Sequence, residues 1–189
     1  APLAASAIAS QIAAVAFMIP LALGQASSVR VGHFAGANDR GNIGRAAWAA
    51  MSAAVATTCA LSLAIALLPA QLVALFLGTA DALTADVIAL AIPLVMITAL
   101  FQTVDGAQVV GISVLRGLND TKWPAILSVG SFWGIGVASG ALFAFHFDFG
   151  PLGLWSGLLV GLSAAALSLG WRMHRSIQRI HSGGSILMG

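Results

Sequence analysis

The sequence predicts an all-α, polytopic bundle of membrane-spanning helices. Of its 189 residues, 59% are hydrophobic and only 7% are charged, whereas about a quarter of an ordinary soluble domain is charged. The mean hydropathy is +0.98. Apolar stretches of about 20 residues, the length that crosses roughly 30 Å of hydrocarbon, recur along the chain. So few charged side chains could not cover the surface of a water-soluble fold of this size.

Five stretches are long enough to cross a bilayer, and the first is expected to continue as helix toward Gly36. Pro20 in the first and Pro93 in the third are expected to kink their helices. The stretch 71–86 is too short to cross, so we expect an interfacial helix and turn there. Residues 176–189 are polar and then rich in Gly and Ser, which predicts a disordered cytoplasmic tail. The five predicted spans cover residues 2–23, 46–68, 87–115, 123–145 and 152–171.

The basic residues predict the orientation of these spans. All eight fall in the connections after spans one and three or after span five, and the opposite connections hold Asp81, Asp86 and Asp148 without Lys or Arg. Because Lys and Arg stay in the cytoplasm, the first span is expected to begin outside and the C-terminus to lie inside. With no signal-peptide pattern ahead of the first span, this orientation suggests an odd number of preceding helices. The basic residues are Arg30, Arg40, Arg45, Arg116, Lys122, Arg172, Arg175 and Arg179.

Asp105 is the strongest candidate for a functional residue. It lies about ten residues, or roughly 15 Å, from the inner end of the third span, near the middle of the bilayer. A central Asp costs about 3 kcal/mol and so requires a partner, a cavity or a proton. Gln102, Gln108 and Thr98 lie on the same helix face, and Gln11 of the first span is a further candidate for lining a cavity. This polar face suits a site for H⁺ or Na⁺, although Asp105 could instead simply hydrogen-bond a neighbouring helix.

Two inner connections resemble each other, Gly36-Ala-Asn-Asp-Arg40 and Gly117-Leu-Asn-Asp-Thr121. We expect a capping role: Gly ends one helix in the left-handed conformation and Asp caps the next. Pro124 fits the first turn of the helix that follows.

Small residues in the last two spans predict close helix packing. Glycines four residues apart let helix backbones approach each other in lipid. Trp133, which lies away from the expected interfaces, is expected to pack inside the bundle. The glycine pairs are Gly130 and Gly134, Gly136 and Gly140, and Gly157 and Gly161.

Several enzyme classes are excluded by composition, and we expect no enzyme. The chain contains no glutamate for a His-Glu-x-x-His zinc site, only one membrane acid where an aspartyl pair needs two, and no deep histidine for a serine hydrolase. Cys59 has no second cysteine, which excludes an internal disulfide or a cysteine-based metal site. We expect no cofactor, no nucleic-acid partner and no metal beyond a possible Na⁺ at Asp105.

Three segments resemble the multidrug and toxin extrusion (MATE) transporters. Residues 20–32 with 36–39 resemble the second helix of a lobe. Residues 101–110, followed by the loop motif Arg116-Gly117 with Asp120-Thr121, are similar to the C-terminal lobe of the NorM-type branch, and residues 153–157 are similar to the start of its last helix. The resemblance covers residues 2 to about 175.

The resemblance implies an antiporter of twelve helices in two lobes, of which this chain would supply helices eight to twelve. Such a protein exports small cationic or amphipathic compounds from the bacterial cytoplasm, across the inner (plasma) membrane, in exchange for H⁺ or Na⁺. Asp105 matches the cation-binding aspartate of that lobe. The other acidic residue of the site would lie on helix seven, so the N-terminal lobe and this preceding helix are the expected partners, together with the lipid bilayer. The alternatives are a lipid-linked oligosaccharide flippase of the same superfamily and a non-transporting scaffold subunit.

Overall fold

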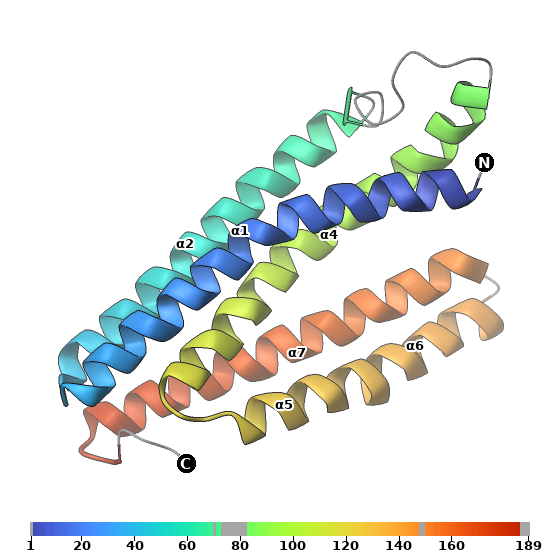
Figure 1. Ribbon diagram of the computed structural model, residues 1–189. Helices are drawn as coiled ribbons and strands as arrows, with labels where there is room; N and C mark the ends of the chain where they lie inside the picture. Colours follow the sequence, from blue (N-terminus) through green and yellow to red (C-terminus); the bar gives the residue numbers. More distant parts are fainter. Residues whose placement is uncertain (1, 70, 73–82, 148–149, 186–189) are drawn as a thin grey trace.

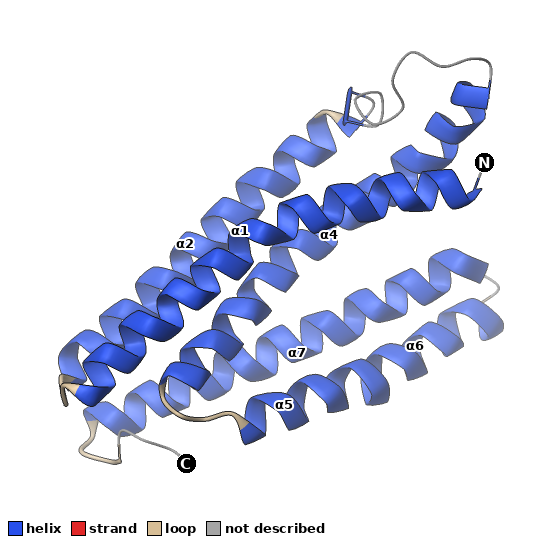
Figure 2. Cartoon of the chain, in the orientation of Figure 1, coloured by secondary structure: helices blue, strands red, loops and turns tan. Residues whose placement is uncertain are grey.

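The computed structural model describes residues 2–69, 71–72, 83–147 and 150–185, and this part of the chain is entirely helix and short turns (Figure 2). Its long helices are α1 (Pro2–Gly36), α2 (Arg40–Leu67), α4 (Leu83–Gly117) and α7 (Gly150–His181). In the sequence, α4 and α7 are joined by one more rod, which packs against α7 and is made of α5 (Lys122–Val129), η1 (Gly130–Val137), α6 (Ala138–Ala141) and η2 (Leu142–His146). Five of these rods are long and apolar enough to cross a membrane, which confirms the predicted fold class.

Each helix extends beyond its predicted span at one or both ends. Pro20 lies inside α1 and Pro93 inside α4, and α1 bends part-way along its length (Figure 1). The interfacial helix predicted at 71–86 lies outside the described residues except at its two ends. The expectation of a disordered tail from residue 176 is corrected, because α7 continues to His181. Ile177 and Ile180 are buried, and this apolar spacing keeps the last turns of α7 packed on the bundle.

The core lies toward one end of the bundle, where α1 ends, α2 begins, α4 ends and α7 ends. We call this the basic end, because all eight Lys and Arg residues lie in its last turns and connections. Gly117 shows how tight the packing is: a Cβ there would lie 2.7 Å from the carbonyl oxygen of Ser28 on α1. The core residues, drawn from α1, α2, α4 and α7, include Val31, Ile43, Ala47, Val110, Val114, Leu115, Leu169, Met173 and Ile180.

Glycines let α7 pack directly against η1 and α6. A Cβ on Gly157 would overlap the backbone of Gly140, and one on Gly161 would lie 2.6 Å from the Cα of Gly136. These two predicted pairs therefore meet across one interface. The third prediction is wrong: Gly130 and Gly134 have no described atom within 4 Å of an added Cβ, because they lie on the outward side of the rod.

We expect Gly157→Ala to lower the free energy of unfolding by at least about 2 kcal/mol, because the methyl group must force two backbones apart. Gly134→Ala is the matched control. It adds the same methyl group at an open position and should leave stability unchanged or slightly raise it. Unfolding in mixed micelles, followed by tryptophan fluorescence, measures both. Equal effects of the two substitutions would contradict the proposed role of this interface.

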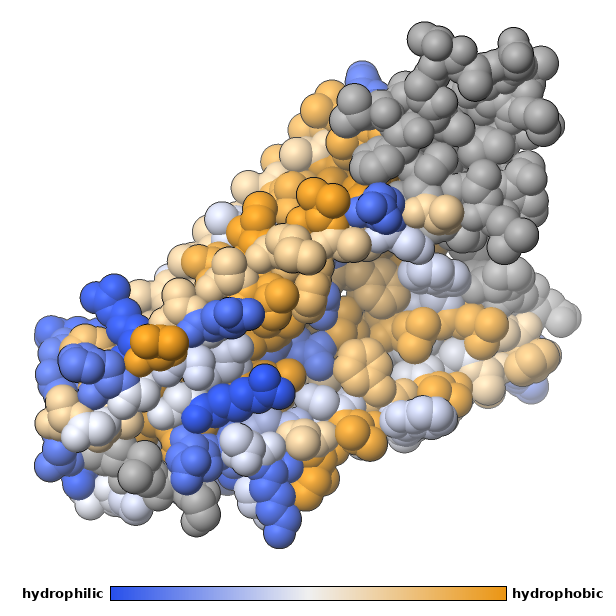
Figure 3. Space-filling model, in the orientation of Figure 1, coloured by the Kyte–Doolittle hydropathy of each residue, from blue (hydrophilic) through white to orange (hydrophobic). Residues whose placement is uncertain are grey.

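On the face seen in Figure 3, the middle of the bundle is mostly apolar, as expected for contact with lipid, and hydrophilic residues gather at the basic end. Trp133 is 73% exposed, so the prediction that it packs inside the bundle is wrong. The buried face of its rod carries Ser131, Gly136, Gly140 and Ala144, and Trp133 points to the opposite side.

The two similar connections at the basic end form different structures. In the first, Asp39 is the N-cap of α2, and both of its carboxylate oxygens accept hydrogen bonds from Asn42, one from the backbone N–H at 3.1 Å and one from the side chain at 2.7 Å. These bonds, with a smaller contribution from the charge of Arg45, hold the pKa of Asp39 below its ordinary value. The capping prediction is confirmed for this aspartate.

In the second connection the N-cap of α5 is Thr121, which makes no side-chain capping bond. Asp120 instead forms an ion pair with Arg172 of α7, with Nε and Oδ2 2.6 Å apart, so the capping prediction for Asp120 is wrong. The left-handed residues are Asn38 and Asn119, with φ of 56° and 61°, rather than the expected glycines, since Asn also tolerates this conformation. Pro124 lies in the first turn of α5, as predicted.

Candidate functional site

A cavity of about 390 Å³ lies beside Asp105, in the half of the bundle away from the basic end. Its walls come from the first half of α1, the middle of α4 and the start of α7. On α1 the lining residues recur with helical spacing, which places them on one face. The lining residues are Ser10, Ala13, Ala14, Phe17, Thr98, Phe101, Gln102, Asp105 and Trp155.

Asp105 has no fixed partner among the described residues. Its carboxylate forms no hydrogen bond or ion pair with a described residue, and no described Lys or Arg lines the cavity. It lies ten residues after Val95 and twelve before Gly117, the two ends of its candidate span, so it is about 15–18 Å from either end. The side chain is partly buried and faces the cavity.

Gln102 adds an unused hydrogen-bond donor to the same cavity. Its side chain is 3% exposed, and its Nε2 has no hydrogen-bond partner among the described residues. A buried amide without a partner is costly, and in a cavity it can bind water or a ligand. Thr98, one turn before Gln102, completes the polar wall.

Two predicted lining residues lie outside this cavity. Gln11 does not line the cavity, because it falls about 100° around α1 from its neighbour Ser10, which does. Gln108 is buried on α4 one turn beyond Asp105, where the cavity has ended, and its Oε1 has no partner. Neither residue therefore meets Asp105 across the described cavity.

Aromatic side chains form the wall that the sequence interpretation missed. Phe101 and Trp155 meet edge to face with ring centroids 5.8 Å apart, which joins α4 to α7 beside Asp105. Phe101 could have been identified as a lining residue from the sequence, because it lies one helical turn before the membrane aspartate. No comparable signal exists for Trp155, because nothing in the sequence places it next to α4.

Helix α2 supports α4 from the side away from the cavity. Gly106 lies so close to Thr58 that a Cβ there would overlap the threonine methyl group. One turn after Thr58 on α2, the hydroxyl of Ser62 donates to the carbonyl oxygen of Ala99 on α4 at 2.6 Å. The same hydroxyl lies 2.9 Å from Oγ1 of Thr103. These contacts fix the rotation of α4, and thereby the direction in which Asp105 faces.

This arrangement can bind a cation. A carboxylate within a membrane span that opens to a cavity and has no counter-ion is costly in free energy. A proton or a small cation that neutralises it removes most of this cost. In the described part of the chain, no three His, Cys, Asp or Glu side chains gather into a metal site.

Comparison with known families and structures decides the identity of this fold. The sequence model of the MatE family matches residues 1–142 of the chain. The chain belongs to the MatE family.

Its MatE relatives include proteins named for drug resistance. The "Probable multidrug resistance protein NorM" of Rhizobium meliloti (strain 1021) is 43% identical over 178 residues, covering 94% of this chain and 38% of the relative. The "Multidrug resistance protein NorM" of Burkholderia vietnamiensis is 44% identical over 172 residues, covering 91% of this chain and 37% of the relative. The chain is thus a NorM-type sequence that spans less than two fifths of the length of these relatives.

Two solved transporters share the fold of this MatE chain. The eukaryotic MATE transporter AtDTX14 superposes with a TM-score of 0.79 at 20% sequence identity, over 94% of this chain and 40% of that structure. An inward-facing multidrug resistance MATE transporter of the MOP superfamily gives a TM-score of 0.80 at 17% identity, over 93% of this chain and 39% of that structure. The helical arrangement is therefore that of a MATE transporter segment.

Proposed function

We propose that this chain works as part of a multidrug efflux antiporter that exchanges H⁺ or Na⁺ for cationic or amphipathic compounds. Its supports are membership of the MatE family, the names of the NorM relatives and five apolar helices. The names of these relatives argue against an enzyme, an oligosaccharide flippase or a scaffold subunit.

In this proposal the chain supplies helices eight to twelve of the C-terminal lobe. The remaining helices, including the one before α1, would complete the cavity that α1, α4 and α7 form on one side, and the resemblance implies an acidic residue on that preceding helix. The basic end would face the cytoplasm of a bacterium, in line with the retention of Lys and Arg there, and the C-terminus would lie inside.

The observation that carries the proposal is the unpaired carboxylate of Asp105 in a cavity near mid-membrane. A cation that enters the cavity neutralises Asp105 and removes the cost of a bare charge in the bilayer. When the lobes reorient and water reaches the site from the other side, the cation leaves. The proposal needs no cofactor beyond this coupling ion.

Efflux of a fluorescent cationic dye tests the proposal. The complete gene product that carries this chain is expressed in bacteria that lack their main drug pumps. We expect energised cells to export the dye, and either a protonophore or the removal of Na⁺ to stop export. Export that survives both treatments, or no export in cells with confirmed membrane expression, would contradict the proposal.

A further inference from the structure

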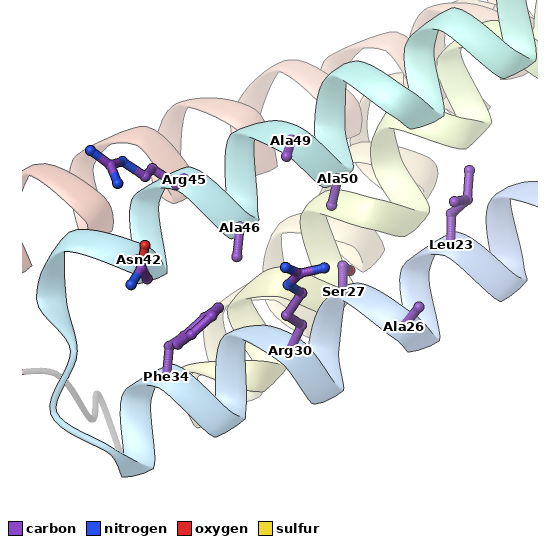
Figure 4. A pocket seen from close by; sticks show the side chains of 10 residues that line it. All are labelled: Leu23, Ala26, Ser27, Arg30, Phe34, Asn42, Arg45, Ala46, Ala49 and Ala50. Carbon is purple, nitrogen blue, oxygen red and sulfur yellow. The ribbon is translucent and has the colours of Figure 1, made fainter.

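A groove between α1 and α2 at the basic end lies outside the Asp105 site. Its volume is about 470 Å³, and both of its walls are helical (Figure 4). A second hollow of about 710 Å³ adjoins it and shares Ala26, Arg30 and Phe34. Arg30 therefore stands in a continuous depression on the surface of the bundle.

The end of the groove nearest the α1–α2 connection is positively charged. Arg30 extends from α1 into the gap between the helices, and Arg45 extends from α2 at the rim (Figure 4). No described carboxylate forms an ion pair with either guanidinium. Asp39 is the acidic residue on the adjoining connection, and both of its oxygens are already bonded by Asn42. The charge of Arg45 also acts on Asp39, but neither guanidinium forms an ion pair with a described carboxylate, so both can donate to an anion in the groove.

The rest of the groove is apolar and widened by small side chains. It runs from Arg30 toward Leu23, about 10 Å closer to the middle of the membrane along α1. Ala26 on α1 faces a wall of alanines on α2, namely Ala46, Ala49 and Ala50. The groove therefore changes from charged to apolar toward the middle of the membrane. A lipid in the adjacent leaflet changes in the same direction, from its headgroup to its acyl chains.

We propose that this groove binds one anionic phospholipid, with its headgroup phosphate between Arg30 and Arg45 and an acyl chain along the alanine-lined wall. Guanidinium groups bind phosphate through charge and paired N–H donors, and basic pockets between membrane helices hold anionic headgroups. The proposal rests on the membrane placement given under Proposed function but not on transport, because lipid binding has its own readout.

Lipid retention measures this binding. The complete gene product is reconstituted in nanodiscs of equal phosphatidylglycerol and phosphatidylcholine and re-extracted in mild detergent, and the retained lipids are counted by mass spectrometry. We expect enrichment of phosphatidylglycerol, reduced about fivefold by Arg30→Gln and further by adding Arg45→Gln. Both arginines are exposed, so these variants should fold normally.

Two controls separate this site from general charge attraction. Arg116→Gln removes the same charge from the same end of the bundle, at an exposed position outside the groove, and should leave enrichment unchanged. Ala26→Leu keeps both arginines but fills the apolar part, and should reduce retention of the lipid. An excess of inorganic phosphate should fail to displace the lipid.

Three results would overturn the proposal. The first is wild-type enrichment in the Arg30→Gln/Arg45→Gln variant. The second is an equal loss with Arg116→Gln, which would indicate diffuse attraction to the membrane surface. The third is displacement by inorganic phosphate together with no effect of Ala26→Leu, which would identify a site for free anions. Unchanged dye efflux alongside any of these outcomes would leave the transport function standing.

Discussion

Asp105→Asn should reduce cation-coupled dye efflux by the complete transporter at least about tenfold, to the level of cells without it. Asparagine has nearly the same shape as aspartate but remains neutral, so it cannot exchange a proton or attract Na⁺. No residue that lines the described part of the cavity supplies a second carboxylate, and an acidic residue on the preceding helix would provide only the other half of the site. The measurement is the initial rate of export after the cells are energised.

Stability separates this functional role from a structural one. Asp105 forms no hydrogen bond or ion pair with a described residue that Asn would break, and removing a charge from mid-membrane lowers the cost of folding there. We therefore expect the Asn variant to reach the membrane in normal amounts and to unfold no more easily than the wild type. A clear loss of stability would instead indicate that Asp105 hydrogen-bonds a neighbouring helix.

Asp39→Asn is the matched control for Asp105→Asn. It makes the same chemical change at a carboxylate outside the membrane spans, and Asn is as good an N-cap as Asp. Export should remain close to the wild-type rate. Normal export in the Asp105 variant, or equal losses in both variants, would rule out Asp105 as the coupling site.

The sequence was sufficient for features that depend on local pattern. Apolar runs predict the helices because a backbone in lipid must satisfy its own hydrogen bonds. The position of Asp105 near the middle of α4 follows from counting residues. The close approach of Gly140 and Gly157 was also predictable in kind, since small residues four apart favour helix contact.

Features that depend on which helices meet could not be predicted in this way. Trp155 lies beside Phe101 only because α7 packs on α4, and the sequence carries no signal of that register. Gln11 and Ser10 are adjacent in sequence and both are exposed, but they lie on different faces of α1 and only Ser10 lines the cavity. Hydropathy cannot distinguish them, because both are polar residues within the same apolar run.

The Asp-containing connections illustrate the same limit. Their sequences are alike, but α2 begins directly after Asp39 while α5 begins one residue later, at Lys122. That single residue moves Asp120 out of the capping position and leaves its carboxylate available to Arg172, 52 residues away. A contact over this distance can be identified only once the fold is known.

Removing one partner of the ion pair between Asp120 and Arg172 should strongly destabilise the basic end. Asp120 is 2% exposed, whereas Arg172 is 25% exposed and also lies over the ring of Trp123, 5.3 Å from its centroid. Arg172→Ala leaves a buried carboxylate without its partner, and we expect it to lower the free energy of unfolding by about 3 kcal/mol. Asp120→Ala should cost less, because the arginine left behind can reach solvent.

Arg175→Ala is the control for this comparison. Arg175 stacks on Trp171 at 3.9 Å from the ring centroid and lies on the exposed side of α7, so its loss should cost no more than about 1 kcal/mol. Unfolding in mixed micelles gives all three values. The expected order is Arg172→Ala, then Asp120→Ala, then Arg175→Ala. Equal costs for the first two would mean that the desolvated carboxylate does not dominate, and that each substitution loses only the ion pair itself.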